Sequence, residues 1–185
     1  MNERSKPSIG TRINVVGTTG SGKTTTARRL AGRLGLRRIE LDALFWKPGW
    51  EQTPDGEFLP AVDQATLRDN WVLDGNYSRS RSITWPRADT IIWLDYSFPR
   101  VFWQLLRRTV RRSATKELLW DGCRERFYLQ FFSRESILLW CLKTYRQRRR
   151  NYPRLFEQPE HAHLQVLRFR SPRQFQQWFD TLPAK

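Results

Sequence analysis

Residues Gly17–Thr24 read GTTGSGKT, and they lie between the apolar run Arg12–Val16 and a helical pattern that begins at Lys23. The stretch fits the pattern G-x-x-x-x-G-K-[ST], in which glycines allow backbone dihedral angles that a Cβ would hinder. Backbone N–H groups from Gly20 to Lys23 can then turn inward around an anion, and the positive end of the following helix points to the same place. The order of strand, loop and helix therefore predicts a phosphate-binding loop.

The fixed positions of this loop predict a nucleotide and a metal ion. Lys23 can bridge the β- and γ-phosphates of ATP, and the Thr24 hydroxyl can ligate Mg²⁺. We therefore expect ATP as phosphoryl donor and Mg²⁺ as cofactor. The residues expected to bind the nucleotide are Gly17, Gly20, Ser21, Gly22, Lys23, Thr24 and Thr25.

Short apolar runs alternate with helical patterns along the rest of the chain. This alternation predicts a single α/β domain over residues 1–185, with a parallel sheet covered by helices on both faces. The expected strands are 12–16, 38–41, 71–74, 90–95 and 164–169. The expected helices are 23–34, 54 to about 68, one starting at 99, 133 to about 150, and one opened by Ser171 and Pro172.

Several acids lie at or just beyond the ends of the predicted strands, where ligands bind in parallel sheets. Asp74 is the natural partner of Thr24 for Mg²⁺, and the alternative is a turn residue preceding Gly75. Asp42 would face the acceptor, either as a base for a hydroxyl group or as a hydrogen-bonding residue that orients the acceptor. Its alternative is a helix cap. Asp95 is expected to be structural.

Positive charge is concentrated in one part of the chain. The formal net charge is +15, and residues 100–154 hold 13 Arg and two Lys against four acids. Such a block predicts an anionic partner. Arg107 and Arg111, four residues apart on a predicted helix, would share one face, as would Arg108 and Arg112. We expect Arg107 and Arg111 to contact the transferring phosphoryl group, while a solvated helix face is the alternative.

Other features exclude some classes of protein. No run approaches the roughly 18 apolar residues that span a bilayer, and the first ten residues lack the apolar core of a signal peptide. Cys123 and Cys141 lie 18 residues apart, with no His or Cys at a metal-binding spacing. They are expected to be reduced thiols in a cytoplasmic protein with no membrane partner.

Together these stretches resemble the adenylate kinase-like group of small P-loop kinases, which includes adenylate, shikimate and gluconate kinases. More closely, the chain is similar to a bacterial subgroup labelled adenylate kinase-like or DNA topology modulation protein. The resemblance covers almost the whole chain. It rests on VVGTTGSGKTTTARRLAGRLG, IELDALFWKPGW, WVLDGNYS, RADTIIWLD, SILLW and RFRSPRQF.

The resemblance implies a P-loop NTPase fold of three α/β/α layers, with a five-stranded parallel sheet in the order 2-3-1-4-5. It also implies an acceptor-binding segment near 43–70, a helical Arg-rich lid near 107–134, and a place beside the adenine for Arg170 and Pro172. One departure concerns the end of the third strand. DGNYS replaces the DGFPR of adenylate kinases, so Arg79 or Arg81 would have to substitute for the missing acceptor-phosphate arginine.

The sequence thus predicts a kinase that moves the γ-phosphoryl group of ATP to a small acceptor. The acceptor is either a nucleoside monophosphate or a small hydroxyl metabolite. The basic block leaves open an alternative, a nucleic-acid-associated NTP-binding regulator or a kinase of nucleic-acid ends. No recognisable DNA-reading module is present, so the small acceptor is favoured.

Overall fold

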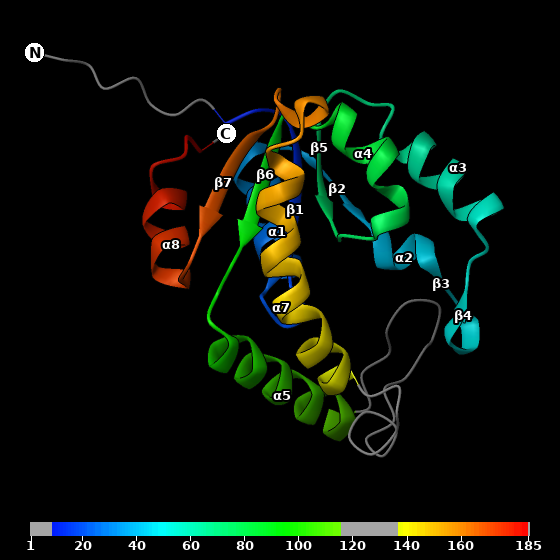
Figure 1. The fold of residues 1–185 in the computed structure, drawn as a ribbon, viewed down its shortest axis with the longest axis vertical. Helices are drawn as coiled ribbons and strands as arrows, with labels where there is room; N and C mark the ends of the chain where they lie inside the picture. Colours follow the sequence, from blue (N-terminus) through cyan, green and yellow to red (C-terminus); the bar gives the residue numbers. More distant parts are fainter. Residues whose placement is uncertain (1–8, 116–136, 185) are drawn as a thin grey trace, which may run out of the picture.

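Five parallel strands form the central sheet of the computed structural model, which describes residues 9–115 and 137–184 (Figure 1). They are β1 (Arg12–Gly17), β2 (Arg37–Glu40), β5 (Trp71–Asp74), β6 (Thr90–Leu94) and β7 (Gln165–Phe169). Their order across the sheet is β2-β5-β1-β6-β7, and every neighbouring pair is parallel. Counted along the chain, the five strands lie in the expected order 2-3-1-4-5.

Helices connect the strands and cover the sheet. They are α1 (Lys23–Leu34), α2 (Leu41–Phe45), α3 (Asp55–Ala65), α4 (Arg81–Arg87), α5 (Phe98–Thr115), α7 (Ile137–Phe156) and α8 (Pro172–Asp180). Short 3-10 turns cover Pro48–Trp50, Ser78–Ser80 and Pro159–His161. A small antiparallel hairpin, β3 (Trp46–Lys47) and β4 (Glu51–Gln52), lies between α2 and α3.

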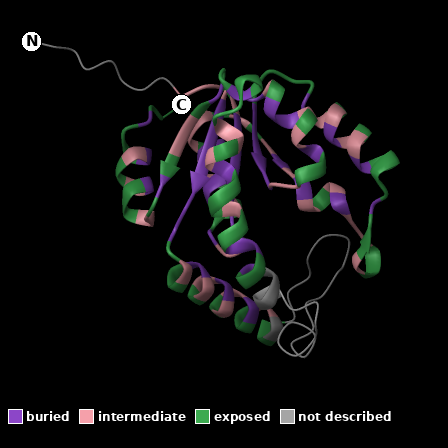
Figure 2. Ribbon diagram, viewed as in Figure 1, coloured by how far each residue is buried: buried purple, intermediate pink, exposed green. Residues whose placement is uncertain are grey.

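Successive side chains of a strand point to opposite faces of the sheet, so the core has two layers, one on each face. Ile13, Val15 and Val72 pack with residues of α1, α5 and α8 on one face. Val16 and Leu73 point the other way and pack with residues of α2, α3, α4 and α7. The strands β1, β5 and β6 are buried between these helices, whereas the edge strands β2 and β7 are partly exposed (Figure 2). The three-layer α/β/α fold expected from the sequence is confirmed.

The parallel register brings the carboxyl ends of all five strands to one edge of the sheet. Asp74 is the register partner of both Val15 and Glu40, and Leu94 pairs with Gly17 and with Phe169. The segments after Gly17, Glu40, Asp74 and Phe169 therefore emerge at the same edge, where parallel sheets bind ligands.

Several boundaries differ from those predicted. Pro54 is the N-cap rather than the first residue of α3, which ends at Ala65. The helix expected from 133 to 150 continues to Phe156, and residues 133–136 lie outside the described part of the chain. The sequence analysis missed α2, the β3–β4 hairpin and α4. Each is too short to show a periodic pattern, and α4 also carries Pro86 inside it.

Asp95 has the structural role that the sequence predicted, because it anchors α7 and β7 to the end of β6. Its side chain is only 3% exposed. Oδ2 accepts hydrogen bonds from Nε and Nη2 of Arg168 at 3.0 and 2.5 Å, and Oδ1 lies 3.0 Å from Nε of Arg149.

We expect Asp95→Ala to lower the free energy of unfolding by about 2–3 kcal/mol, because it removes a buried carboxylate that accepts charge-assisted hydrogen bonds from two largely exposed arginines. Urea denaturation measures this difference. Asp69→Ala, which removes an exposed carboxylate, is the control and should change stability by less than about 0.5 kcal/mol. An equally small effect of Asp95→Ala would contradict the structural role.

No helix in the described ranges, 9–115 and 137–184, has the length and apolar character that crossing a membrane requires.

Candidate phosphate-binding and acceptor site

The predicted phosphate loop lies at the carboxyl edge of the sheet, between the end of β1 and the start of α1. Gly20 and Gly22 have positive φ values of 87° and 92°, which residues with a Cβ rarely adopt. A Cβ at Gly20 would also lie 2.8 Å from Cβ of Leu105 on α5. Glycine at position 20 therefore allows both the turn of the loop and its close contact with α5.

Most of the expected backbone donors of the loop are available to a ligand. Within the described residues, no hydrogen bond uses the backbone N–H of Gly20, Gly22 or Lys23. The N–H of Ser21 differs from the prediction, because it donates to the carbonyl oxygen of Thr18 at 3.0 Å. The Ser21 hydroxyl is buried and has no hydrogen-bond partner, whereas Thr25 is exposed in the first turn of α1.

Lys23 is the cation that the loop itself provides. Its ammonium group donates to the carbonyl oxygen of Thr18 at 3.3 Å. Burial and the positive charge of Arg148 lower the pKa of Lys23 to about 8, while the carboxylates of Asp74 and Asp42 oppose this shift. A bound phosphate would add negative charge beside Lys23 and favour its protonated form.

Asp74 and Thr24 lie together near Lys23, as the predicted magnesium site requires. The Thr24 hydroxyl forms a hydrogen bond with the Asp74 carboxylate. Burial raises the pKa of Asp74, and the charge of Lys23 and this hydrogen bond act against the rise. A buried carboxylate beside a hydroxyl gives Mg²⁺ the oxygen ligands that it prefers, so these residues fit the ion.

Asp42 lies in the first turn of α2, and a tyrosine from the end of β5 holds its side chain. The Tyr77 hydroxyl donates to Oδ1 of Asp42 at 2.6 Å. Burial, together with the charge of Asp42, raises the pKa of Tyr77 well above its usual value, so Tyr77 stays a donor. The negative charge of Asp42 also raises the pKa of Lys23 and that of Asp74, so Asp42 acts electrostatically on both groups of the phosphate-binding site.

Asn76 and Arg148 contact the same backbone atom of the loop. The Asn76 side chain donates to the carbonyl oxygen of Gly17 at 2.9 Å, and Nη1 of Arg148 donates to it at 3.4 Å. The charge of Arg148 acts on the pKa of Lys23. No carboxylate in the described ranges pairs with Arg148. Helix α7, which carries part of the basic block, therefore brings a cation to the phosphate loop.

The sequence analysis missed Arg148 because it lies in the run RQRRR, where neighbouring arginines look equivalent. A signal was nevertheless present. The inward face of α7 carries Cys141, Thr144, Tyr145 and Tyr152, and Arg148 shares their helical phase. Cys141 on this face lies with its Sγ 3.6 Å from the carbonyl oxygen of Thr19. An arginine on the side of a helix that faces the protein interior is expected to have a buried or ligand-binding role.

The two arginine pairs of α5 differ in their exposure. Arg107 and Arg111 are exposed, whereas Arg108 and Arg112 are partly buried, and the charge of Arg108 acts on the pKa of Lys23. This placement favours Arg108 over the pair that we chose. A phosphate contact by Arg107 or Arg111 stays a prediction. The rest of the expected lid, with Arg124, Arg126 and Arg134, lies outside the described residues, as does Cys123.

Arg170 and Pro172 lie where β7 meets α8, at the same edge of the sheet as the phosphate loop. The Arg170 backbone N–H donates to Oε1 of Gln174 at 2.8 Å, and Ser171 caps α8 by accepting from the Gln174 backbone. A contact of these residues with adenine stays a prediction.

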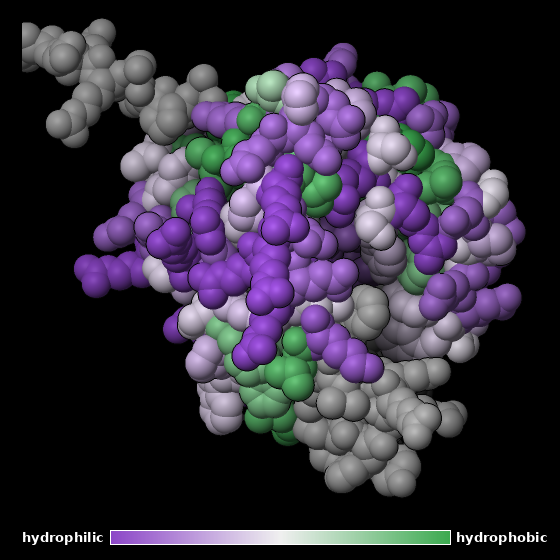
Figure 3. Space-filling model, viewed as in Figure 1, coloured by the Kyte–Doolittle hydropathy of each residue, from purple (hydrophilic) through white to green (hydrophobic). Residues whose placement is uncertain are grey.

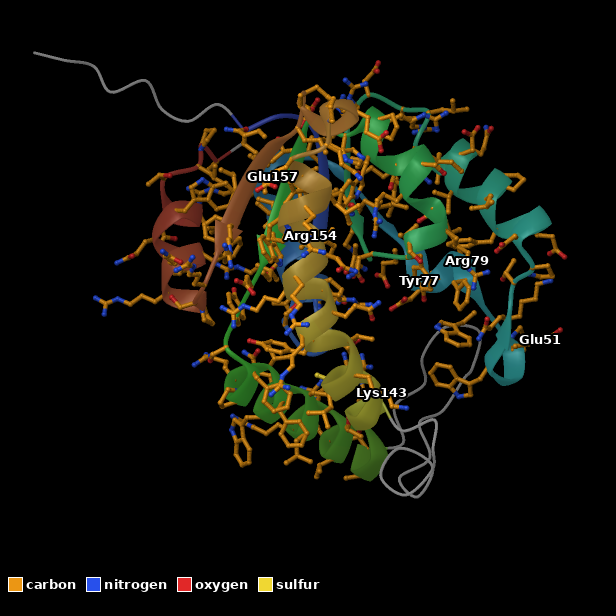
Figure 4. All side chains as sticks on the ribbon, in the orientation of Figure 1. Glu51, Tyr77, Arg79, Lys143, Arg154 and Glu157 are labelled. Carbon is orange, nitrogen blue, oxygen red and sulfur yellow. The ribbon has the colours of Figure 1, made fainter. Side chains whose placement is uncertain are left out.

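Arg79 and Arg81 follow the end of β5, but among the residues that the structure describes only Arg79 has an acidic partner. Arg79 forms an ion pair with Asp55 and lies over the ring of Phe45, 4.8 Å from its centroid. Figure 4 shows Arg79 beside Tyr77, on the same side of α7. Arg81 is half-buried and lies over Trp85 instead, with its guanidinium carbon 4.8 Å from the ring centroid. The structure thus distinguishes two arginines that the sequence left equivalent.

Comparison with known proteins agrees with this fold. Two cytidylate kinases of Nitratidesulfovibrio vulgaris, strains DP4 and Hildenborough, are each 42% identical to the chain over 57 residues. The match covers 31% of this chain and 23% of each relative, so the chain aligns with less than a quarter of their length. No family model matches the chain.

Solved structures match over most of the chain. A shikimate kinase from Acinetobacter baumannii in complex with shikimate has a TM-score of 0.53 at 19% identity, covering 92% of this chain and 90% of that one. A shikimate kinase from Bacteroides thetaiotaomicron has a TM-score of 0.54 at 16% identity, covering 92% and 94%. At these identities the likeness shows a shared fold alone, and it leaves the acceptor undetermined.

Proposed function

We propose that the chain is an ATP-dependent phosphotransferase that moves the γ-phosphoryl group of ATP to a small acceptor. The observation that carries this proposal is one cluster of side chains at the carboxyl edge of the sheet. Lys23 and Thr24 belong to the phosphate loop, and Asp74 at the end of β5 forms a hydrogen bond with Thr24. Asp42 acts on both Lys23 and Asp74 from α2, and Arg148 reaches the loop from α7. Phosphate-binding donors, a pair of Mg²⁺ ligands and a further carboxylate at one place are the groups that transfer to an acceptor uses.

Each group has a role that its surroundings support. The free N–H donors of the loop and Lys23 would hold the β- and γ-phosphates, and Arg148 would stabilise negative charge that develops during transfer. Thr24 and Asp74 would hold Mg²⁺, which neutralises phosphate charge when bound. Asp42, fixed by Tyr77, would orient the acceptor or accept its proton.

The acceptor is a nucleoside monophosphate or a small hydroxyl metabolite. The partial match to cytidylate kinases supports the first class, and the fold likeness to shikimate kinases is compatible with the second. A screen with γ-labelled ATP tests the proposal on nucleoside monophosphates, small polyols, sugar acids and shikimate. We expect label in one of these classes. Absence of ATP binding would contradict the proposal.

Asp42→Asn separates the two acceptor classes, because a phosphate acceptor is already nucleophilic whereas a hydroxyl group benefits from a base. For a hydroxyl acceptor we expect kcat to fall by about 10²- to 10⁴-fold, and for a phosphate acceptor by less than about tenfold. Initial rates with the labelled acceptor measure the difference. Tyr77→Phe is the control, since it keeps the carboxylate and removes only the group that holds it.

One observation favours a second candidate, a kinase that acts on nucleic-acid ends. Lys143, Arg146, Arg150 and Arg154 recur at helical spacing on the exposed side of α7, and none forms an ion pair with the described residues. Hydrophilic side chains gather over this helix in Figure 3. The same screen should therefore include 5′-hydroxyl oligonucleotides. Binding that fails to weaken with rising salt would remove this candidate.

A further inference from the structure

One polar side chain, that of Asn76, joins three parts of the molecule beside the phosphate loop. It follows the end of β5, and its Nδ2 donates to the carbonyl oxygen of Gly17 at 2.9 Å and to the hydroxyl of Tyr152 at 2.7 Å. A side-chain amide nitrogen carries two hydrogens, so both are used. Asn76 therefore ties the segment after β5 to the start of the phosphate loop and to α7.

The backbone beside Asn76 is itself held by a buried side chain of β1. Asn14 is 1% exposed, and its Nδ2 donates to the carbonyl oxygens of Leu73 and Gly75 at 3.3 and 3.1 Å. Its Oδ1 accepts a hydrogen bond from Nε1 of Trp85 at 3.1 Å. A buried amide that is hydrogen-bonded at both ends favours one arrangement of the chain around it. The segment that carries Asn76 is thus fixed to the strand from which the phosphate loop continues.

The second partner of Asn76, Tyr152, gives α7 a defined position. Tyr152 is 3% exposed, and its ring centroid lies 5.6 Å from those of Trp93 and Phe156. Arg148 lies four residues earlier, one turn away on the same side of the helix, and its charge acts on the pKa of Tyr152. A helix that is held at Tyr152 therefore has its Arg148 side chain directed toward the same place.

Arg148 needs such support, because it lies near another cation. Its Nη1 donates to the Gly17 carbonyl oxygen at 3.4 Å, and its positive charge contributes to the lowered pKa of Lys23. No acidic side chain within residues 9–115 and 137–184 forms an ion pair with Arg148. Since like charges repel, neutral contacts hold this end of α7 beside the loop, and the hydrogen bonds of Asn76 are the ones that connect the two.

We propose that Asn76 is a positioning residue, which holds α7 against the phosphate loop so that Arg148 can act on a bound γ-phosphate. The inference rests on the proposed phosphotransferase function and explains how a distant helix supplies an arginine to the loop. It also gives two neighbouring residues different tasks. Asn76 serves the loop and α7, whereas Tyr77 donates to Asp42 on the opposite side.

A double-mutant cycle between Asn76 and Arg148 tests the proposal. Calorimetry on the full chain measures the affinities for ADP and for a non-hydrolysable ATP analogue, each with Mg²⁺, and their ratio isolates the contribution of the γ-phosphate. The variants are Asn76→Ala, Arg148→Gln, the combination of the two, and Tyr152→Phe alone and with Arg148→Gln. Asn151→Ala is the matched control, since Asn151 is exposed on α7 beside Tyr152. Thermal unfolding checks that each variant folds.

We expect Arg148→Gln to lower the preference for the ATP analogue over ADP about tenfold, and Asn76→Ala to lower it about fivefold or more. In the Arg148→Gln background, Asn76→Ala should cost less than a further twofold, because the arginine through which Asn76 acts is gone. Tyr152→Phe should show the same dependence on Arg148, and it decides the matter if Asn76→Ala does not fold. Asn151→Ala should change the preference less than twofold.

A loss from Asn76→Ala that is equally large with and without Arg148 would overturn the inference, because a merely structural role gives that result. An unchanged preference in Asn76→Ala or in Arg148→Gln would overturn it as well. Transfer of label to an acceptor by the wild type would leave the proposed function standing in these cases. If the wild type binds the analogue but transfers no label, the proposed function fails, and the affinities still decide the role of Asn76. If it binds neither nucleotide, both fail.

Discussion

Lys23→Ala should abolish measurable phosphoryl transfer, a loss of about 10³-fold or more in kcat. Lys23 is the cation of the phosphate loop itself, and removing one such group that stabilises transition-state charge costs at least about 10²- to 10³-fold. The fold should survive, because the lysine side chain makes a single hydrogen bond, to the Thr18 carbonyl oxygen. Transfer of label from γ-labelled ATP measures the loss, and thermal unfolding checks stability.

Lys143→Ala is the matched control for this prediction. It removes an exposed lysine at the start of the described part of α7, visible in Figure 4, and should leave the rate within about twofold of the wild type. Undiminished transfer by Lys23→Ala would contradict the proposed mechanism. Equal loss in both variants would show that net charge, rather than the position of Lys23, controls the rate.

Arg148→Gln should lower kcat by about 10²-fold, because Arg148 is the arginine of α7 that reaches the phosphate loop. Glutamine keeps much of the side-chain volume and removes the charge. Arg146→Gln and Arg150→Gln are close controls, since both residues are exposed on the same helix and neither contacts the loop. We expect less than about twofold change from either.

Steady-state kinetics at saturating ATP separate this prediction from a general effect of charge. A similar loss in all three variants would assign the effect to the basic surface of α7 as a whole. A loss confined to Arg148→Gln, with unchanged thermal unfolding, is the result that the structure predicts.

The fold was predictable because its central strands are short, apolar runs that are buried on both faces. The run WVLD matches β5 residue for residue, and TIIWL forms β6. Elements of five to seven residues gave no periodic signal, so α2 and α4 became visible only when their packing was known. Whether such short elements form depends on tertiary contacts, which cannot be read from the sequence.

The residues of the candidate site could be predicted from the sequence where the motif has a fixed spacing. They were harder to predict where the side of a helix that faces the loop decides which residue takes part. The positions of Lys23, Thr24 and Asp74 follow from the loop pattern and from the end of a strand. Choosing Arg148 within RQRRR, or Arg108 over Arg107, requires knowing which face of each helix meets the loop. Arg79 and Arg81 show the same limit, because only Arg79 meets an acid from α3.

The central claim is transfer of the γ-phosphoryl group to an acceptor, and the fate of the label tests it most directly. Wild-type protein, γ-labelled ATP, Mg²⁺ and the responding acceptor class are incubated together, and ADP, labelled acceptor and inorganic phosphate are quantified. We predict that labelled acceptor and ADP form in equal amounts, and that neither forms with Lys23→Ala. Label that appears only as inorganic phosphate, with every acceptor class, would contradict the claim.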